Sequence, residues 1–140
     1  MGYRIVCLII AGLILSGGTA ISGDAGKEAA AVSAAKKWLA LVDAGEYASG
    51  WKEAAELFRN AVKPEQWEQS MQAVRKPLGK LISRKVQTKI YETSLPGAPD
   101  GEYVVIQFAT SFENKKTAIE TVTPMMDKDG KWRVSGYYIK

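Results

Sequence analysis

The 140-residue sequence contains no histidine and a single cysteine, Cys7. Histidine is the usual general base near neutral pH, and histidine and cysteine together supply most transition-metal ligands. Cysteine also provides the thiolate of thiol-dependent enzymes. The absence of histidine excludes imidazole chemistry, and a single cysteine makes thiol chemistry a poor basis for function. We expect neither a metal site nor a cofactor.

Long apolar runs are scarce as well, and the most prominent one lies near the N-terminus, over residues 5–15. This run of eleven residues is shorter than the roughly 20 that a membrane-spanning helix needs. Arg4 precedes it and small residues up to Ala20 follow, a pattern typical of a secretory signal peptide cleaved after Ala20. The alternative is an uncleaved membrane anchor. We expect residues 1–20 to be removed and residues 21–140 to form one periplasmic or secreted domain without a spanning segment.

Loss of the signal segment would remove Cys7 together with one basic residue. The mature chain would then carry 18 Lys and Arg against 15 Asp and Glu, a net charge of +3. It could form no disulfide within itself, although exported proteins often do. Its stability would have to come from core packing, which is feasible at this length.

Apolar residues recur at helical spacing in three segments of the first half of the mature chain. The spacing predicts a helix over residues 28–44 that stops at Gly45, and a second over residues 51–62. A third should start at Pro64 and end before Pro77. Each apolar face carries one tryptophan, which we interpret as core: Trp38, Trp51 and Trp67.

After residue 79 the apolar period changes to two, which predicts four strands. Their ranges are residues 81–93, 103–113, 117–126 and 131–139. The last two connections are short, and short connections make antiparallel hairpins. We therefore expect an α+β domain in which three N-terminal helices pack on a curved, four-stranded antiparallel meander.

The short turns suggest a register for the sheet. With residues 114–115 as a two-residue loop, Phe108 faces Thr121. With residues 129–130 as the next loop, Thr121 faces Tyr138. Because directly opposite residues share a face, all three side chains should lie on the apolar face that the helices cover. The Asp-rich segment before residue 130 lacks the later ligands of a calcium loop, so we interpret it as a hairpin turn.

Hydroxyl groups on an otherwise apolar face need hydrogen-bond partners. Two solutions stay open: they bond within a packed core, or they line a cavity for a ligand. The residues that would line this cavity are Trp51, Phe108, Thr121, Thr123 and Tyr138. Glu120 is expected on the opposite face, but a one-residue bulge would bring it inside.

A series of short blocks spans about residues 31–139 in a specific order. The blocks are Trp38-Leu39, Asp43-Ala44-Gly45-Glu46-Tyr47, Ser49-Gly50-Trp51, Val74-Arg75-Lys76-Pro77-Leu78-Gly79, Ser83-Arg84, Leu95-Pro96-Gly97-Ala98-Pro99-Asp100-Gly101-Glu102-Tyr103, Glu120-Thr121-Val122-Thr123 and Trp132-Arg133-Val134-Ser135-Gly136-Tyr137-Tyr138. Together they resemble the domain of unknown function 4019 family. The resemblance implies a small exported domain of a Gram-negative envelope, with no activity assigned. The order of helices and strands also resembles the cystatin-like or nuclear-transport-factor-2-like α+β cone, in which a curved sheet can leave a pocket.

Basic residues concentrate in the middle of the chain, where residues 59–89 hold 8 Lys and Arg against 2 acidic residues. A surface built from them would attract anionic lipid head groups, polysaccharide or an acidic partner. The alternative is a solvated face with chance clustering. Nucleic acid is a poor partner for an exported chain without a recognition module. The residues of this possible basic patch are Arg75, Lys76, Lys80, Arg84 and Lys85.

These observations favour a non-enzymatic exported domain that binds an apolar or anionic small molecule, or another envelope protein. One alternative is a small lyase or isomerase in which Glu120, brought inside by a bulge, acts as a base beside Tyr138. Another is a structural accessory whose outer sheet face docks a partner.

Overall fold

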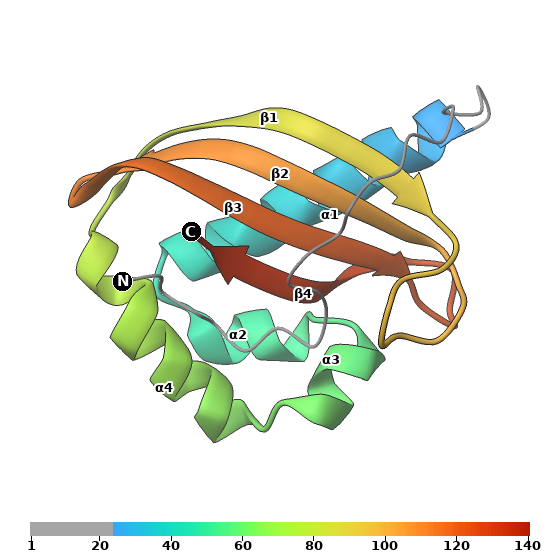
Figure 1. Ribbon diagram of the computed structural model, residues 1–140. Helices are drawn as coiled ribbons and strands as arrows, with labels where there is room; N and C mark the ends of the chain where they lie inside the picture. The colour runs from blue at the N-terminus through green and yellow to red at the C-terminus, as the bar shows by residue number, and fades with distance from the viewer. Residues whose placement is uncertain (1–23) are drawn as a thin grey trace.

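The computed structural model describes residues 24–140, so the expected signal segment, residues 1–20, lies outside the described residues. Helices come first and strands follow (Figure 1). The elements are α1 (Asp24–Asp43), α2 (Tyr47–Lys52), α3 (Glu56–Ala61), α4 (Pro64–Val74), a single 3-10 turn η1 (Lys76–Leu78), β1 (Leu81–Glu92), β2 (Tyr103–Phe112), β3 (Lys115–Met126) and β4 (Trp132–Ile139). The expected α+β class is confirmed, and the strands form an antiparallel meander in the order β1-β2-β3-β4.

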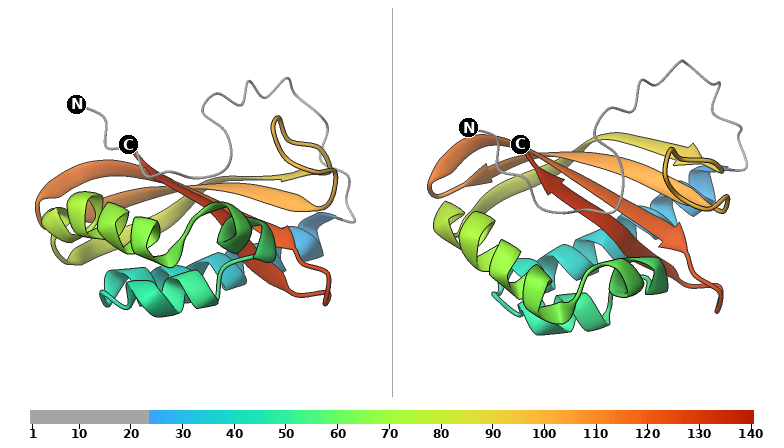
Figure 2. Two further views of the ribbon diagram at one scale, coloured as in Figure 1. Left: turned by 90° about the horizontal axis from the view of Figure 1, so that it is seen from below. Right: turned by 60° about the horizontal axis from the view of Figure 1, so that its bottom comes forward.

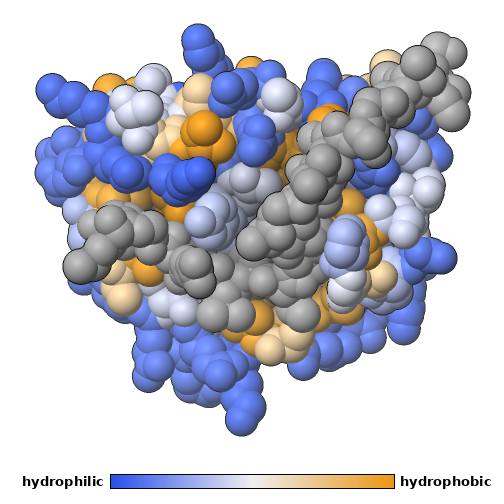
Figure 3. Space-filling view, viewed as in Figure 1, coloured by the Kyte–Doolittle hydropathy of each residue, from blue (hydrophilic) through white to orange (hydrophobic). Residues whose placement is uncertain are grey.

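The helices lie on one side of the curved sheet (Figure 2). Helix α1 crosses behind all four strands, while α2, α3 and α4 pack below it, near β4 (Figure 1). Hydrophilic residues gather over β1 at the top of this view and over α4 at the bottom (Figure 3). Within residues 24–140, no helix is long and apolar enough to cross a membrane.

Helix α1 forms because its small and apolar residues recur every three to four positions. Ala31, Ala35, Trp38, Leu39 and Val42 make up the buried face. The helix stops where expected, because Gly45 adopts a φ of 78°, a conformation that glycine accepts at little cost.

The expected helix over residues 51–62 is wrong, since the chain breaks there into α2 and α3, and residues 24–140 form four α-helices. Ala55 is extended, and its N–H donates to the carbonyl of Val134 on β4 at 2.8 Å. The Asp127 carboxylate then accepts the N–H of Glu56, the first residue of α3, at 3.2 Å. These contacts with distant residues replace hydrogen bonds within one helix, which local periodicity does not reveal.

The expected register between β2 and β3 is wrong by one residue. Phe108 pairs with Glu120 and not with Thr121. The turn lies at residues 113–114, and β3 then carries one extra residue before Ala118, which pairs with Thr110. Because side chains alternate along a strand, this bulge moves Glu120 to the inner face and Thr121 to the outer one.

The register between β3 and β4 agrees with expectation over its first part. Thr121 pairs with Tyr138 and Thr123 with Gly136, but a shift after Thr123 pairs Met125 with Arg133. The side chain of Ser135 donates to the Thr123 carbonyl at 2.7 Å and so holds this bulge. Tyr138 therefore lies on the outer face together with Thr121.

Four aromatic side chains fill the space between the helices and β4, and we call them the aromatic cluster: Trp38, Phe58, Trp67 and Tyr137. Their ring centroids lie 5.2 to 6.4 Å apart in tilted or edge-on contacts, the geometry that aromatic pairs prefer. The indole N–H groups of Trp38 and Trp67 donate to the carbonyls of Gly50 and Tyr47 at 2.8 and 2.9 Å. The cluster thus fixes α2 against α1 and α4.

Candidate functional site

A second cluster beside the aromatic one is built from charged groups, and we call it the charged cluster. It lies between the end of α1, the α4–β1 connection and the inner face of the sheet. Its members are Asp43, Arg75, Arg84, Thr110, Glu120 and Tyr137.

Glu120 is fully buried at the centre of this cluster. Its Oε1 accepts from Arg84 Nε at 2.7 Å and from the Thr110 hydroxyl at 2.6 Å. Its Oε2 accepts from Arg84 Nη2 at 3.2 Å and from the Tyr137 hydroxyl. Four donors therefore match the four acceptor positions of a carboxylate. Burial raises the pKa of Tyr137 well above its usual range, and the neighbouring Glu120 raises it further, so the phenol stays protonated as a donor.

Arg84 connects Glu120 to the end of α1. It donates to both oxygens of Asp43, at 2.7 and 3.0 Å, and Arg75 donates to the same carboxylate at 3.1 Å. Burial lowers the pKa of Arg84, but hydrogen bonds to the two carboxylates outweigh it and hold the pKa above its ordinary value. Two cations and two anions thus balance within the cluster, as buried charges require.

The predicted base does not have the geometry of a general base. A base must reach the proton that it removes, whereas Glu120 is enclosed and its oxygens are occupied. Tyr138, the predicted partner, lies on the other face of the sheet, and Tyr137 takes the place beside the carboxylate. The arrangement holds the fold together and offers no visible route for a substrate.

The predicted cavity residues do not come together on one face. Phe108 lies in the main core, and Trp51 packs against that core with its indole N–H donating to the Val62 carbonyl at 2.7 Å. Thr121 and Tyr138 are half-buried on the outer face, because the register differs from the expected one. Thr123, unlike Thr121 and Tyr138, is buried.

The predicted basic patch separates into two groups. Arg75 and Arg84 are buried in the charged cluster, with exposed fractions of 3% and 10% for their side chains. Lys76, Lys80 and Lys85 are exposed. Arg84 lies two residues before Val86 in the same strand, so strand periodicity by itself would have placed it on the inner face.

A groove of about 850 Å³ runs between α1, α2 and the start of β4. Sequence reasoning missed it, because three separate segments form it. Its apolar wall includes Trp38, Leu41 and Trp132. Its charged residues are Lys37, Glu53, Lys131 and Arg133.

Trp132 differs from the other three tryptophans of the chain. Their indole N–H groups all donate to backbone carbonyls, whereas no group among residues 24–140 accepts the indole N–H of Trp132. The ring is half-buried and packs against the core. A half-buried indole with an open donor is suited to a ligand that has an apolar body and an acceptor.

The cations of the groove differ in their availability. The guanidinium of Arg133 makes two 2.7 Å hydrogen bonds to Asp129 and a third, at 3.3 Å, to Asp127. Lys37 and Lys131 are exposed and make no ion pair with any described residue. Their ammonium groups can therefore receive an anionic group.

Among residues 24–140, no three or more Asp, Glu, His or Cys side chains lie close enough together to hold a metal ion. No curated protein and no solved structure matches this chain. A family model described as "Protein of unknown function (DUF4019)" matches residues 34–137, which include both clusters and most of the groove. The chain therefore belongs to the family of proteins of unknown function DUF4019.

Proposed function

We propose that this protein is an exported, non-enzymatic binding domain of a bacterial envelope. Its ligand is a small molecule with an apolar body and an anionic group, held in the groove between α1, α2 and β4. The observation that carries the proposal is the half-buried Trp132 ring, with its open indole N–H, in the wall of that groove.

The dimensions and charges of the groove support this ligand class. A volume of about 850 Å³ falls within the range of small-molecule sites. Lys37 and Lys131 line the groove from two different segments: Lys37 lies on α1, and Lys131 directly precedes β4. Glu53 is the one acidic residue in the groove lining, so the two lysines, which make no ion pair with a described residue, leave the lining positive. This balance favours an anion.

Binding can be tested with naphthalene-2-carboxylate, a planar anion, as the probe. We expect it to shift the indole signal of Trp132 in ¹H–¹⁵N spectra more than the signals of Trp38 and Trp67. Lys37→Gln with Lys131→Gln should weaken binding about tenfold, because two charge contacts are lost. Lys36→Gln is the matched control, since Lys36 neighbours Lys37 but does not line the groove.

Two results would count against the groove as the binding site. One is a probe that leaves the Trp132 signal unmoved at millimolar concentration. The other is equal weakening by the Lys36 control and the paired variant. Native mass spectrometry of the purified protein then separates the alternatives, because a co-purifying small molecule supports a ligand site and a bound protein supports a docking domain.

Export has its own test. The mass of the protein recovered from a periplasmic extract should match a chain that begins at residue 21. Full-length protein retained in the cytoplasm would contradict export while leaving the groove proposal intact.

A further inference from the structure

A separate cleft of about 330 Å³ lies where the ends of α1 and α4 meet the beginnings of α2 and β1. It shares no residue with the groove beside Trp132. Its volume is at the lower end of the range for small-molecule sites. Its polar walls are formed mainly by Asp43, Tyr47, Gln72, Arg75, Lys76 and Lys80, with Glu113 from the β2–β3 turn at one side.

Tyr47 is the unusual member of this cleft. Its side chain is largely buried, with a residue exposure of 6%, yet its hydroxyl makes no hydrogen bond with any described residue. That hydroxyl is not fully enclosed either, so it reaches the surface of the cleft. Burial raises the pKa of Tyr47, Arg75 opposes the rise and Asp43 adds to it. The hydroxyl therefore keeps its proton and is an unused donor.

Arg75 provides a fixed positive charge beside this donor. It donates to the Gly79 carbonyl at 2.6 Å and to Asp43 at 3.1 Å, and its guanidinium lies 4.5 Å from the centre of the Phe112 ring. Asp43 is further neutralised by two hydrogen bonds from Arg84. The buried wall of the cleft is thus rigid and is not anionic overall.

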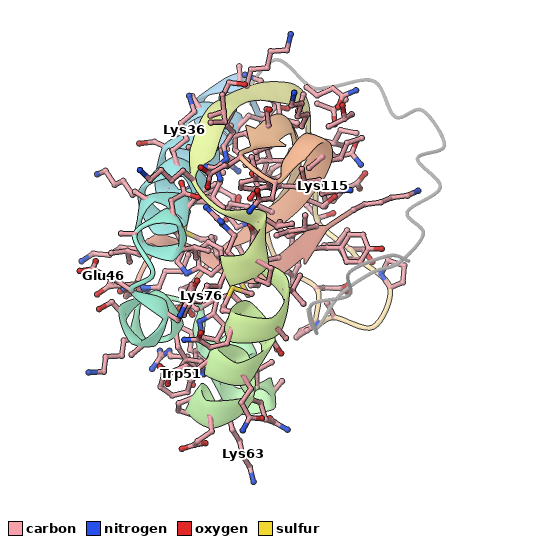
Figure 4. All side chains as sticks on the ribbon, turned by 90° about the vertical axis from the view of Figure 1, so that its left-hand side faces the viewer. Lys36, Glu46, Trp51, Lys63, Lys76 and Lys115 are labelled. Atoms are coloured by element: carbon pink, nitrogen blue, oxygen red, sulfur yellow. The ribbon has the colours of Figure 1, made fainter. Side chains whose placement is uncertain are left out.

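Two lysines complete the cleft on its solvent side. Lys76 follows α4 and Lys80 precedes β1, and both are exposed. Lys76 is labelled in Figure 4. Neither makes an ion pair with another described residue. Glu113 opposes them with one negative charge, and its carboxylate lies 3.5 Å from the backbone nitrogen of Lys80. Counting Arg75, Asp43 and Glu113 with the lysines, the lining carries three cations and two anions.

We propose that this cleft binds the phosphate or carboxylate group of a small soluble molecule. The Tyr47 hydroxyl donates a hydrogen bond to the anion, and Lys76 and Lys80 supply its charge partners. Arg75 stays bound to Asp43 and Gly79 and holds the wall in place. The proposal is independent of ligand binding in the groove beside Trp132, because the two sites use different residues.

The test uses the purified protein with inorganic phosphate and with acetate as probes, at constant ionic strength maintained with chloride. We expect at least one of the two oxyanions to shift the backbone signals of residues 45–47 and 76–80 in ¹H–¹⁵N spectra. Tyr47→Phe should weaken that binding about tenfold, because a hydrogen bond to a charged group is lost. Its melting temperature should stay unchanged, because the hydroxyl has no partner among the described residues.

A second variant, at Lys76 and Lys80, tests the same site independently of Tyr47→Phe. Lys76→Gln with Lys80→Gln should weaken oxyanion binding about fivefold. Lys63→Gln should leave it unchanged, since Lys63 lies at the opposite end of α4 (Figure 4). Binding that survives in both the Tyr47 variant and the paired lysine variant would overturn the proposal.

Vesicles of phosphatidylglycerol form the last arm and distinguish a soluble anion from a lipid head group. Binding to free phosphate or acetate without retention on vesicles supports a soluble ligand. Retention on vesicles without a response to either free anion would overturn the proposal in favour of a membrane surface.

Discussion

The aromatic cluster and the charged cluster lie side by side between the helices and the sheet, and they contribute to the fold in different ways. The aromatic cluster buries large rings whose contacts tolerate small adjustments. The contacts of the charged cluster depend on the position of individual atoms. Glu120 accepts hydrogen bonds from four donor groups, and Arg84 donates to two carboxylates. Tyr137 belongs to both, with its ring against Trp38 and its hydroxyl on Glu120.

The comparison suggests a division between stability and register. Sliding β3 by one residue would move Val122 out of the core, and it would also turn Glu120 outward and leave Arg84 buried beside Asp43 and Arg75. Unbalanced buried charge costs several kcal/mol. We infer that the aromatic cluster supplies most of the stabilisation, whereas the charged cluster selects the pairing of β2 with β3.

The largest expected effect on stability comes from removing one partner of the buried ion pair between Arg84 and Glu120. Arg84→Met leaves Glu120 buried without its cation, and we expect the free energy of unfolding to fall by about 3 to 5 kcal/mol. Urea denaturation measures the loss. Arg84→Met combined with Glu120→Leu should regain most of it, because apolar residues replace the whole pair. A single substitution that costs less than about 1 kcal/mol would show that the pair is not desolvated.

The aromatic cluster should respond less sharply to a conservative change. Trp67→Phe removes ring volume and the hydrogen bond to the Tyr47 carbonyl, so we expect a loss of about 2 to 3 kcal/mol. The same substitution at the half-buried Trp132, which lacks such a bond, should cost clearly less. Equal losses in the free energy of unfolding at Trp67 and Trp132 would show that the hydrogen bond and the deeper burial of Trp67 do not matter for stability.

Tyr137→Phe separates the two roles of one side chain. The ring contacts remain, and Glu120 loses one of its four donors. We expect a loss of about 1 to 2 kcal/mol in the free energy of unfolding. If the loss reaches that of Trp67→Phe, the hydroxyl matters as much as a ring of the aromatic cluster, and the proposed division fails.

The smallest effect is expected outside both clusters, at the β3–β4 turn. Hydrogen bonds from Arg133 lower the pKa of Asp129 from 3.8 to about 2. A carboxylate whose pKa is lower in the folded state stabilises the protein above its unfolded pKa, and this contribution disappears as the pH falls through the folded pKa. Asp129→Asn should therefore make melting temperature slightly less dependent on pH between about 4 and about 2. An unchanged pH dependence would show that Asp129 is not paired in solution.

The sequence was sufficient to predict the fold class, the four strands and the end of α1, because these depend on local periodicity and on a glycine at residue 45. It also identified a bulge as the change that would bring Glu120 inside. It did not reveal the break at Ala55, since the cause is a hydrogen bond to Val134 about eighty residues away.

The candidate sites were harder to predict than the fold. The clustering of Arg75, Arg84 and the lysines in sequence suggested one basic surface, but burial separates the arginines from the lysines. A register error of one residue was enough to assign Thr121 and Tyr138 to the wrong face. The groove beside Trp132 depends on three segments that meet only in the folded chain.

The pairing of Phe108 tests the central claim most directly. Nuclear Overhauser contacts between the backbones of β2 and β3 report which residue lies opposite each position. The structure predicts that Phe108 lies opposite Glu120, with the Thr110 and Ala118 pair two residues along. Contacts that instead place Phe108 opposite Thr121 would turn Glu120 away from Arg84 and contradict the charged cluster as a whole.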